Sequence, residues 1–460
     1  MLGRRYFIRM AGVLAGLALV GTSHKANAAD TGSTPGPPNI LLILTDDQGW
    51  SQVSKEMHPD FPGSRSGYLS TPNMDRLANE GMRFTSGYSP APWCTPTRRS
   101  VLCGISAART GGMNESKWVP AAHMTIPKAL KQANPAYHCA HFGKWGEQLI
   151  SSPEDCGYDA SDGQTGNVTG GMEKKQRPFH IVDDPKRTGT VTERAIQFMR
   201  KEAKAGNPFF VQVSYYAVHL RVELLETTLK KYKEKGQPDR AYSPAWAGML
   251  EELDHGVGNL LKALDDLVIA DNTYVVFMSD NGGRGLMPGG GKSRLPPNHP
   301  LSGAKGSLLE GGIRVPFFIR GPGLRPGTYC HVPVVGYDLL PTFYDLAGGK
   351  QPLPSDVDGG SIRPLFANPD KGIVKRPLDS LIFHHPGKLM SAIRQDDHKL
   401  FVLWDKSGEI ESRALHNVQS DPAEKQNLSA SDPRLADELQ EILVNFLAKV
   451  DPEKPTRKEK

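Results

Sequence analysis

The sequence predicts an α/β fold whose main sheet is mostly parallel, followed by a small antiparallel sheet near the C-terminal end. Continuous apolar runs at residues 39–44 and 273–278 lack polar alternation, which is typical of strands buried on both faces of a parallel sheet. Stretches with helical periodicity, such as residues 244–266, alternate with these runs, as they do in α/β proteins. After about residue 365 the pattern changes to short strands joined by turns, and one amphipathic helix follows.

Length and composition are those of a globular protein with a large core. The chain has 460 residues, of which 38% are hydrophobic and 23% are charged. We expect a large catalytic domain over residues 36–365, a C-terminal subdomain over 366–452 and a charged tail over 453–460. The formal net charge is +5, but the basic residues are dispersed, so no nucleic-acid partner is expected.

The N-terminus has the features of an export signal. Arg4-Arg5 belongs to a twin-arginine motif, and residues 10–21 form an apolar run that is short for a membrane span. Residues 26–28, Ala-Asn-Ala, fit a cleavage site with small side chains. The sequence thus predicts a twin-arginine signal peptide over residues 1–29, cleaved near Ala28. The expected partner is the twin-arginine translocase, the expected location is periplasmic or secreted, and no stable membrane anchor is expected.

Capping residues predict the boundaries of several other elements. Thr71-Pro72 begins a helix that ends at Gly81, and Thr190 with Glu193 has the spacing of a capping box for a later helix. Asp432-Pro433 begins the last helix. Further strands are expected at residues 209–214, 315–319, 381–384, 391–394 and 399–404.

Residues 94–104, Cys-Thr-Pro-Thr-Arg-Arg-Ser-Val-Leu-Cys-Gly, predict a short helix with a reactive N-terminus. Pro96 suits the first helical turn and Gly104 suits the C-terminal end. Cys94 then lies at the start of the helix, where free N–H groups and the helix dipole favour anions. Arg98 is one turn further on the same face. A nucleophile, a dipole end and an arginine together suggest attack on an anionic ester.

Oxygen-bearing side chains follow two of the predicted buried strands. Asp46 and Asp47 come after the first strand, and Asp280 and Asn281 come after a later one. Open α/β sheets bind ligands at the carboxyl ends of their strands, and adjacent buried carboxylates need a partner or a cation. A set of oxygen donors without His or Cys suits Ca²⁺ or Mg²⁺ rather than zinc. The thiolate of Cys94 fits such a hard cation badly.

Taken together, these segments resemble the sulfatase family of the alkaline phosphatase superfamily. Residues 94–98, Cys-Thr-Pro-Thr-Arg, match the family motif C-x-P-x-R. Each matching motif is weak by itself, but their joint occurrence in this order over most of residues 38–450 is highly specific. The other matching segments are residues 38–47, 71–78, 142–145, 279–282, 303–306, 310–316, 338–342 and 421–428.

The resemblance implies the fold of this family, a large mixed, mostly parallel sheet flanked by helices, and its activity, the hydrolysis of sulfate esters. It also implies that a formylglycine-generating enzyme oxidises Cys94 to formylglycine, whose hydrated aldehyde is the nucleophile. Oxygen in place of sulfur at position 94 removes the mismatch with a hard cation. The metal, with Ca²⁺ expected before Mg²⁺, would be bound by Asp46, Asp47, Asp280 and Asn281 together with the modified Cys94.

The same resemblance implies roles for four basic side chains. Arg98 and Lys144 are expected to stabilise the formylglycine diol. Lys305 and His219 are expected to hold the sulfate, and one of them to protonate the leaving oxygen. The expected substrates are sulfated saccharides.

One departure from the family pattern concerns the release of sulfate. Relatives usually have a histidine after the Lys-Trp pair of the motif at 142–145, but this chain has Gly146. His141, Lys144 or a water are the candidates to replace that histidine. Arg221 follows His219 closely, where relatives often have a proline, and is either a substrate contact or a surface residue.

Two other functions remain as alternatives. A hydrolase of phosphonate monoesters or phosphodiesters is one, because relatives with that activity share the nucleophile motif. A catalytically impaired protein that binds sulfated glycans is the other, and Gly146 suggests it. Assays with the three ester types separate the two hydrolases, and the chemical state of Cys94 separates an enzyme from a binding protein.

Two further features allow more than one interpretation. His384-His385 ends a predicted strand and either reaches the site from the small subdomain or lies on the surface. The chain has five cysteines, an odd number, which leaves one free or functional thiol and room for two disulfides among the others.

Overall fold

The main sheet is organised around β1 (Asn39–Thr45), whose seven residues are all buried. It tolerates apolar side chains on both faces because it lies inside the sheet. It pairs in parallel with β7 (Phe209–Ser214) on one side and with β9 (Thr273–Ser279) on the other. The two predicted buried strands are thereby confirmed. The computed structural model describes residues 36–112, 116–147, 149–172, 177–291 and 295–450.

The sheet is mixed and mostly parallel, as predicted. Its pairings are parallel except for the two antiparallel ones that β10 makes with β9 and β2. In pairing order the eight strands are β11 (Thr328–Cys330), β2 (Met82–Phe84), β10 (Phe317–Arg320), β9, β1, β7, β4 (His138–Gly143) and β5 (Ala160–Ser161). Two small two-stranded sheets pair β3 (Gly87–Tyr88) with β12 (Val334–Val335) and β6 (His180–Ile181) with β8 (Glu223–Leu224).

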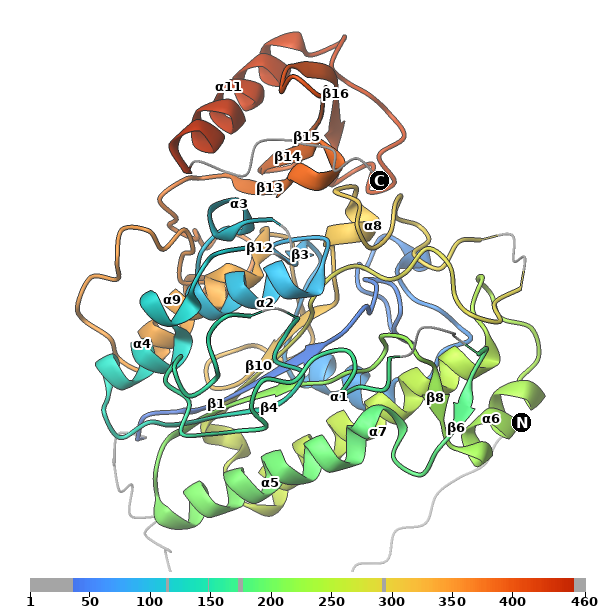
Figure 1. Ribbon diagram of the computed structural model, residues 1–460, viewed down its shortest axis with the longest axis vertical. Helices are drawn as coiled ribbons and strands as arrows, with labels where there is room; N and C mark the ends of the chain where they lie inside the picture. Colours follow the sequence, from blue (N-terminus) through green and yellow to red (C-terminus); the bar gives the residue numbers. More distant parts are fainter. Residues whose placement is uncertain (1–35, 113–115, 148, 173–176, 292–294, 451–460) are drawn as a thin grey trace, which may run out of the picture. The chain divides into compact units, whose positions relative to one another are not determined.

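Helices cover both faces of the main sheet (Figure 1). Successive residues of β1 alternate between the two layers: Leu41 and Ile43 belong to the apolar cluster under α1, α5 and α7, whereas Leu42 and Leu44 belong to the one under α2, α4 and α9. The helices of this part are α1 (Pro72–Glu80), α2 (Cys94–Cys103), α3 (Ala107–Thr110), α4 (Ile126–Ala133), α5 (Thr188–Ala205), α6 (Glu226–Glu234), α7 (Pro244–Asp266), α8 (Glu310–Ile313), α9 (Leu339–Leu346) and α10 (Pro364–Ala367).

The caps of α1 and α5 differ from the predicted ones. Thr71 precedes α1, but its hydroxyl accepts a hydrogen bond from the backbone N–H of Ser54 and does not cap the helix. The first N–H groups of α1 instead donate to the carboxylate of Asp254 in α7. The capping box that starts at Thr190 is wrong, because α5 already begins at Thr188 and Asp184 accepts from its first turn. Carboxylates outside the predicted cap positions therefore bind both helix starts.

The C-terminal part is a four-stranded antiparallel sheet covered by one helix, as predicted. The strands are β13 (Leu381–His385), β14 (Met390–Gln395), β15 (His398–Trp404) and β16 (Ile410–Asn417), paired in this order, and the helix is α11 (Pro433–Val450). Leu439, Leu443 and Leu447 of α11 pack on Leu400 and Leu415 of the sheet. The sequence analysis missed β16, whose residues alternate irregularly and are mostly only half-buried.

A buried group of charged side chains joins the small sheet to the main domain. Lys399 of β15 donates to Glu310 at 2.9 Å and to Glu424 at 2.8 Å. Glu310 also accepts from Arg314 at 2.5 Å and from the hydroxyl of Tyr88 at 2.7 Å. We call these five residues the C-terminal charge network. They lie in the part of the chain from Gly36 onwards, which forms one compact unit.

Several predictions fall outside the described residues or remain untested. The signal peptide over residues 1–29 and the tail over 453–460 lie outside them, and the boundary at residue 365 stays a prediction. Among the described residues, no helix is long and apolar enough to cross a membrane. The five cysteines, all described, are buried and free, so the structure forms neither of the two disulfides for which their number leaves room.

Candidate active site

The predicted metal ligands meet at the carboxyl ends of two inner strands of the main sheet. β1 and β9 are parallel neighbours, so Asp46 and Asp47 after the one lie beside Asp280 and Asn281 after the other. The backbone N–H of Asp47 donates to Asp280 at 3.2 Å, and the amide of Asn281 donates to Asp47 Oδ1 at 2.9 Å. All four side chains are buried. The tertiary structure thus brings the four residues together as predicted.

Three oxygen atoms at this corner are buried without a hydrogen-bond partner among the described residues. They are Oδ1 of Asp46, Oδ2 of Asp47 and Oδ1 of Asn281. A buried oxygen without a partner costs about 1–3 kcal/mol, so three at one point need an explanation. Ligand atoms of Asp46, Cys94 and Asp280 lie within 4.8 Å of one another, and so do those of Asp46, Asp47 and His219. This donor set fits a hard divalent cation such as Ca²⁺ or Mg²⁺.

Two buried cations hold the inner carboxylates in place. Arg98 of α2 donates to Asp280 Oδ2 through Nε at 3.1 Å and through a terminal nitrogen at 2.7 Å. Its other terminal nitrogen donates to the backbone carbonyl of Lys144 at 2.6 Å. Lys144, which follows β4, donates to Asp46 Oδ2 at 2.5 Å. Both oxygens of Asp280 therefore accept hydrogen bonds, whereas Oδ1 of Asp46 has no hydrogen-bond partner among the described residues.

The charges at the corner shift each other's pKa values. Burial by itself raises the pKa of Asp46, but the surrounding basic groups, led by Lys144, outweigh it and hold that pKa well below its usual value. Burial and the neighbouring Asp46 raise the pKa of Asp280 to about 6, against the lowering effect of Arg98. Burial lowers the pKa of Lys144, but Asp46 raises it more, so Lys144 stays protonated. A divalent cation would relieve the repulsion between the carboxylates.

Cys94 is the first residue of α2, as predicted, and is 3% exposed. The helix begins here because Trp93 before it is extended, with φ −139° and ψ 148°, while its carbonyl already accepts from Thr97. The helix ends at Gly104, whose φ of 69° suits glycine. Position 94 therefore lies at the positive end of the helix dipole, which favours negative charge there.

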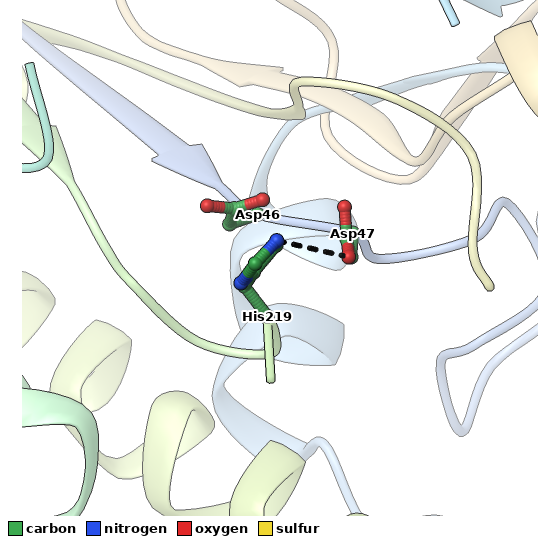
Figure 2. A group of neighbouring side chains, drawn as sticks. All are labelled: Asp46, Asp47 and His219. Atoms are coloured by element: carbon green, nitrogen blue, oxygen red, sulfur yellow. Dashed lines mark ion pairs between the residues drawn. The ribbon is translucent and has the colours of Figure 1, made fainter. Parts of the chain in front are cut away.

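Lys305 and His219 approach the same corner from two loops. Lys305 donates to Asp47 Oδ1, and its Nζ lies 5.3 Å from the centre of the Trp93 ring. The Nε2 atom of His219 lies 3.9 Å from Asp47 Oδ2 (Figure 2), and its Nδ1 atom lies 2.9 Å from the carbonyl of Leu220. That carbonyl can only accept, so Nδ1 carries the ring proton. Burial lowers the pKa of His219 to about 4, although Asp47 acts in the opposite direction.

A histidine at position 146 would have a strained backbone, and the side chain of Leu149 would have to move. The φ of Gly146 is +152°, and a Cβ atom there would lie 2.7 Å from a methyl carbon of Leu149. His141 is buried, with Nε2 3.1 Å from the hydroxyl of Ser214 and its ring 4.9 Å from that of Trp145. Burial lowers the pKa of His141 to about 3. These contacts hold His141 within the sheet layer.

The structure also places three residues whose role the sequence left open or missed. Arg221 is half-buried and pairs with Glu223 at 2.7 Å. His385 is buried and accepts a hydrogen bond from Trp93 at 2.9 Å, so its assignment to the surface is wrong. Arg284, which the sequence analysis missed, lies 3.8 Å from Asp47 Oδ2. The sequence feature that could have identified Arg284 as a site residue is its position three residues after Asn281.

Comparisons with known proteins identify the family. The family model "Sulfatase" matches residues 38–349, and the model "N-sulphoglucosamine sulphohydrolase, C-terminal" matches residues 304–451. A sulfatase of Formosa agariphila is 28% identical, and the match covers 86% of this chain and 85% of the relative. The N-acetylgalactosamine-6-sulfatase of Homo sapiens is 29% identical over 82% of this chain and 73% of its own.

A solved structure supports the same assignment. The crystal structure of Ps i-CgsB in complex with k-i-k-neocarrahexaose superposes with a TM-score of 0.73. It is 27% identical, and the match covers 92% of this chain and 94% of the other. The family model spans well over half of this chain, and the mixed sheet carries the expected motif residues at one edge. The chain therefore belongs to the sulfatase family, the sulfuric ester hydrolases of the alkaline phosphatase superfamily.

Proposed function

We propose that this protein hydrolyses sulfate esters of saccharides through a formylglycine made from Cys94, with Ca²⁺ as the metal. The observation that carries the proposal is the corner of three buried oxygens without partners, next to position 94 and surrounded by Arg98, Lys144 and Lys305. Such a corner suits a cation and an anionic ester together. The cation neutralises the carboxylates, and the basic side chains neutralise the ester.

The residues of this chain suit the steps of the reaction. Formylglycine hydrate supplies an oxygen nucleophile, and a bound divalent cation supplies the charge that lowers the pKa of its hydroxyl. Arg98, held by Asp280, and Lys144, held by Asp46, stabilise negative charge at position 94. When the S–O bond to the alcohol breaks, a proton from Lys305 passes to the leaving oxygen, because neutral His219 carries its one ring proton on Nδ1, where the carbonyl of Leu220 accepts it.

The release of sulfate needs a proton acceptor near position 94. Gly146 offers no side chain, and His141 is packed between Ser214 and Trp145. Lys144 stays protonated because Asp46 raises its pKa, so it cannot act as a base. We assign this proton to water. Because water at neutral pH is a weaker base than imidazole, release is expected to be slower than attack.

The saccharide substrate is supported by the relatives. One is named for N-acetylgalactosamine 6-sulfate, and one solved structure holds a neocarrahexaose oligosaccharide. A sulfated sugar is also consistent with Arg284, a cation beside Asp47 whose side chain is one-third exposed.

The test compares the protein produced with and without a formylglycine-generating enzyme. Mass spectrometry of the peptide that contains Cys94 reports the modification, and turnover is measured on sulfated sugars, an aryl sulfate, a phosphodiester and a phosphonate monoester. We expect turnover of sulfate esters only when residue 94 is modified. Preference for the phosphorus esters would favour the second hydrolase, and binding of sulfated glycans without turnover by modified protein would favour the binding function that Gly146 suggests.

Export is proposed by the twin-arginine route, with cleavage near Ala28 and a periplasmic or secreted product. This route carries folded proteins, which allows formylglycine to form in the cytoplasm first. Replacing Arg4-Arg5 by two lysines should leave the protein in the cytoplasm with its full-length N-terminus. Fractionation and N-terminal sequencing measure this, and unchanged export would contradict the proposal.

A further inference from the structure

The end of β13 and the turn Pro386–Lys388 bring the small C-terminal sheet to the active site. His385, the last residue of β13, accepts at Nε2 a hydrogen bond from the indole N–H of Trp93 at 2.9 Å. Lys388 in the turn donates to the backbone carbonyl of Gly306 at 2.6 Å. Both contacts cross from the small sheet to loops of the main domain.

The two contacted residues are the chain neighbours of catalytic candidates. Trp93 directly precedes Cys94, and Gly306 directly follows Lys305. The loops are also joined to each other, since the N–H of Gly306 donates to the carbonyl of Pro92 at 2.9 Å. In addition, the Trp93 ring faces the ammonium of Lys305 at 5.3 Å. A shift of Trp93 would therefore move both positions 94 and 305.

The packing at this place leaves little freedom. A Cβ atom on Gly306 would lie 2.9 Å from the Lys388 ammonium and 3.1 Å from the Trp93 ring, and the φ of Gly306 is +82°. Glycine is thus required both by the backbone and by the close approach of two side chains. The loop that carries Lys305 is confined between Trp93 and the small sheet.

The hydrogen bond between Trp93 and His385 has a defined direction. An indole N–H can only donate, so Nε2 of His385 accepts and the ring proton is on Nδ1. Burial, with smaller contributions from Lys388 and His384, lowers the pKa of His385 to about 4. The ring is therefore neutral and able to accept throughout the neutral range.

We propose that His385 and Lys388 are positioning residues of the sulfatase reaction, which hold the nucleophile at position 94 and Lys305 at a fixed separation through Trp93 and Gly306. The small sheet is then a working part of the active site in addition to a stabilising one. The kinetic side of this inference rests on the proposed function. Errors of about 1 Å in the separation of reacting groups lower turnover by about a hundredfold.

The experiment uses full-length modified protein, four single variants and the double variant that combines His385→Leu with Trp93→Phe. His385→Leu removes the acceptor, His385→Gln keeps one, and Trp93→Phe keeps the ring but removes the donor. Trp404→Phe is the matched control, because the indole N–H of Trp404 donates to Ser391 at 2.9 Å within the same small sheet and not to a loop of the main domain. For each variant we would measure kcat, KM, Tm and the indole N–H resonances in ¹⁵N-labelled protein.

We expect His385→Leu and Trp93→Phe to lower kcat by about tenfold to a hundredfold with KM changed by less than about threefold. The double variant should be no worse than either single one, because both remove the same contact. His385→Gln should recover most of kcat. Trp404→Phe should lower Tm to a similar extent as His385→Leu and leave kcat unchanged.

The indole N–H resonance of Trp93, identified by its absence in Trp93→Phe, should shift in His385→Leu and keep its position in Trp404→Phe. An unshifted resonance in His385→Leu, or a loss of kcat no larger than that of Trp404→Phe, would overturn the inference. If the wild type prefers phosphonate over sulfate esters, only the proposed function fails. The ratio of kcat between each variant and the wild type is then measured on the phosphonate and still tests the positioning role.

Discussion

The chain contains two buried groups of charged side chains that are completed in different ways. In the C-terminal charge network, no buried side-chain nitrogen or oxygen lacks a hydrogen-bond partner among the described residues. The second group, which we call the active-site cluster, consists of Asp46, Asp47, Cys94, Arg98, Lys144, Asp280, Asn281 and Lys305. In this cluster, three buried oxygens lack a hydrogen-bond partner among the described residues.

The difference shows which cluster serves stability and which serves chemistry. Lys399 lies between Glu310 and Glu424, so each of its neighbours compensates it within the fold. Asp46 and Asp47 each have one oxygen that accepts a hydrogen bond from a lysine, and the other oxygen of each is buried without a hydrogen-bond partner among the described residues. A fold that needed only stability would pair those oxygens as well, because leaving them unpaired is costly. We therefore propose that a ligand completes the active-site cluster.

The largest effect that separates the two clusters is expected for Cys94→Ala. It removes the precursor of the nucleophile, so turnover should fall by at least about 10⁴-fold. The melting temperature should stay within a few degrees of the wild type, because the contact that the sulfur of Cys94 makes with the hydroxyl of Thr95, at 4.0 Å, is long and weak. Steady-state assays and calorimetry on the same preparation measure both. Retained turnover would exclude position 94 as the nucleophile.

Lys399→Met should have the opposite profile. It leaves Glu310 and Glu424 buried beside each other without their shared cation, and breaking such a pair costs roughly 3–5 kcal/mol. Urea unfolding should show this loss, while kcat per folded molecule stays near that of the wild type. A variant with normal stability would show that the network contributes nothing to the attachment of the small sheet.

Calcium should stabilise the protein through the active-site cluster only. With free Ca²⁺ at about a hundredfold its Kd, the free energy of unfolding should rise by about 2.7 kcal/mol. Asp47→Asn should lose most of this gain because one ligand charge is missing, whereas Lys399→Met should keep it. Thermal unfolding in EGTA and in Ca²⁺ measures the difference. An equal response of the wild type and Asp47→Asn would contradict the assigned ligands.

The smallest expected effect is the acid response of the C-terminal charge network. Burial by itself raises the pKa of Glu310, but Arg314 and Lys399 outweigh it and hold that pKa well below the ordinary value of 4.5. Below pH about 4.5 the unfolded chain thus binds more protons than the folded one, so the stability from Glu310 is present above this pH and is lost as the pH falls. Lys399→Met should show a shallower loss between pH 5 and 3, by about 1 kcal/mol. Urea unfolding at several pH values measures it, and equal slopes would contradict the prediction.

Elements with strong periodicity were predictable, and those that depend on distant partners were not. β1 and α7 (Pro244–Asp266) follow from continuous apolar runs and regular spacing. The cap of α1 was not predictable, because Asp254, nearly two hundred residues away in the chain, accepts from its first N–H groups. β16 was missed because its exposed edge residues do not alternate.

The sequence by itself determined the family and the candidate reacting groups. The motif around Cys94, the carboxylates after two buried strands and the two lysine motifs supply the groups of the proposed reaction, since short spacings place them on helix starts and strand ends. Tertiary structure alone decided which of these charged groups pair with each other and which stay unpaired. Only folding shows which carboxylate oxygens stay unpaired, that Leu149 fills the space beside Gly146, and that His385 reaches Trp93. Such contacts join residues far apart in the chain, and local sequence patterns carry no information about them.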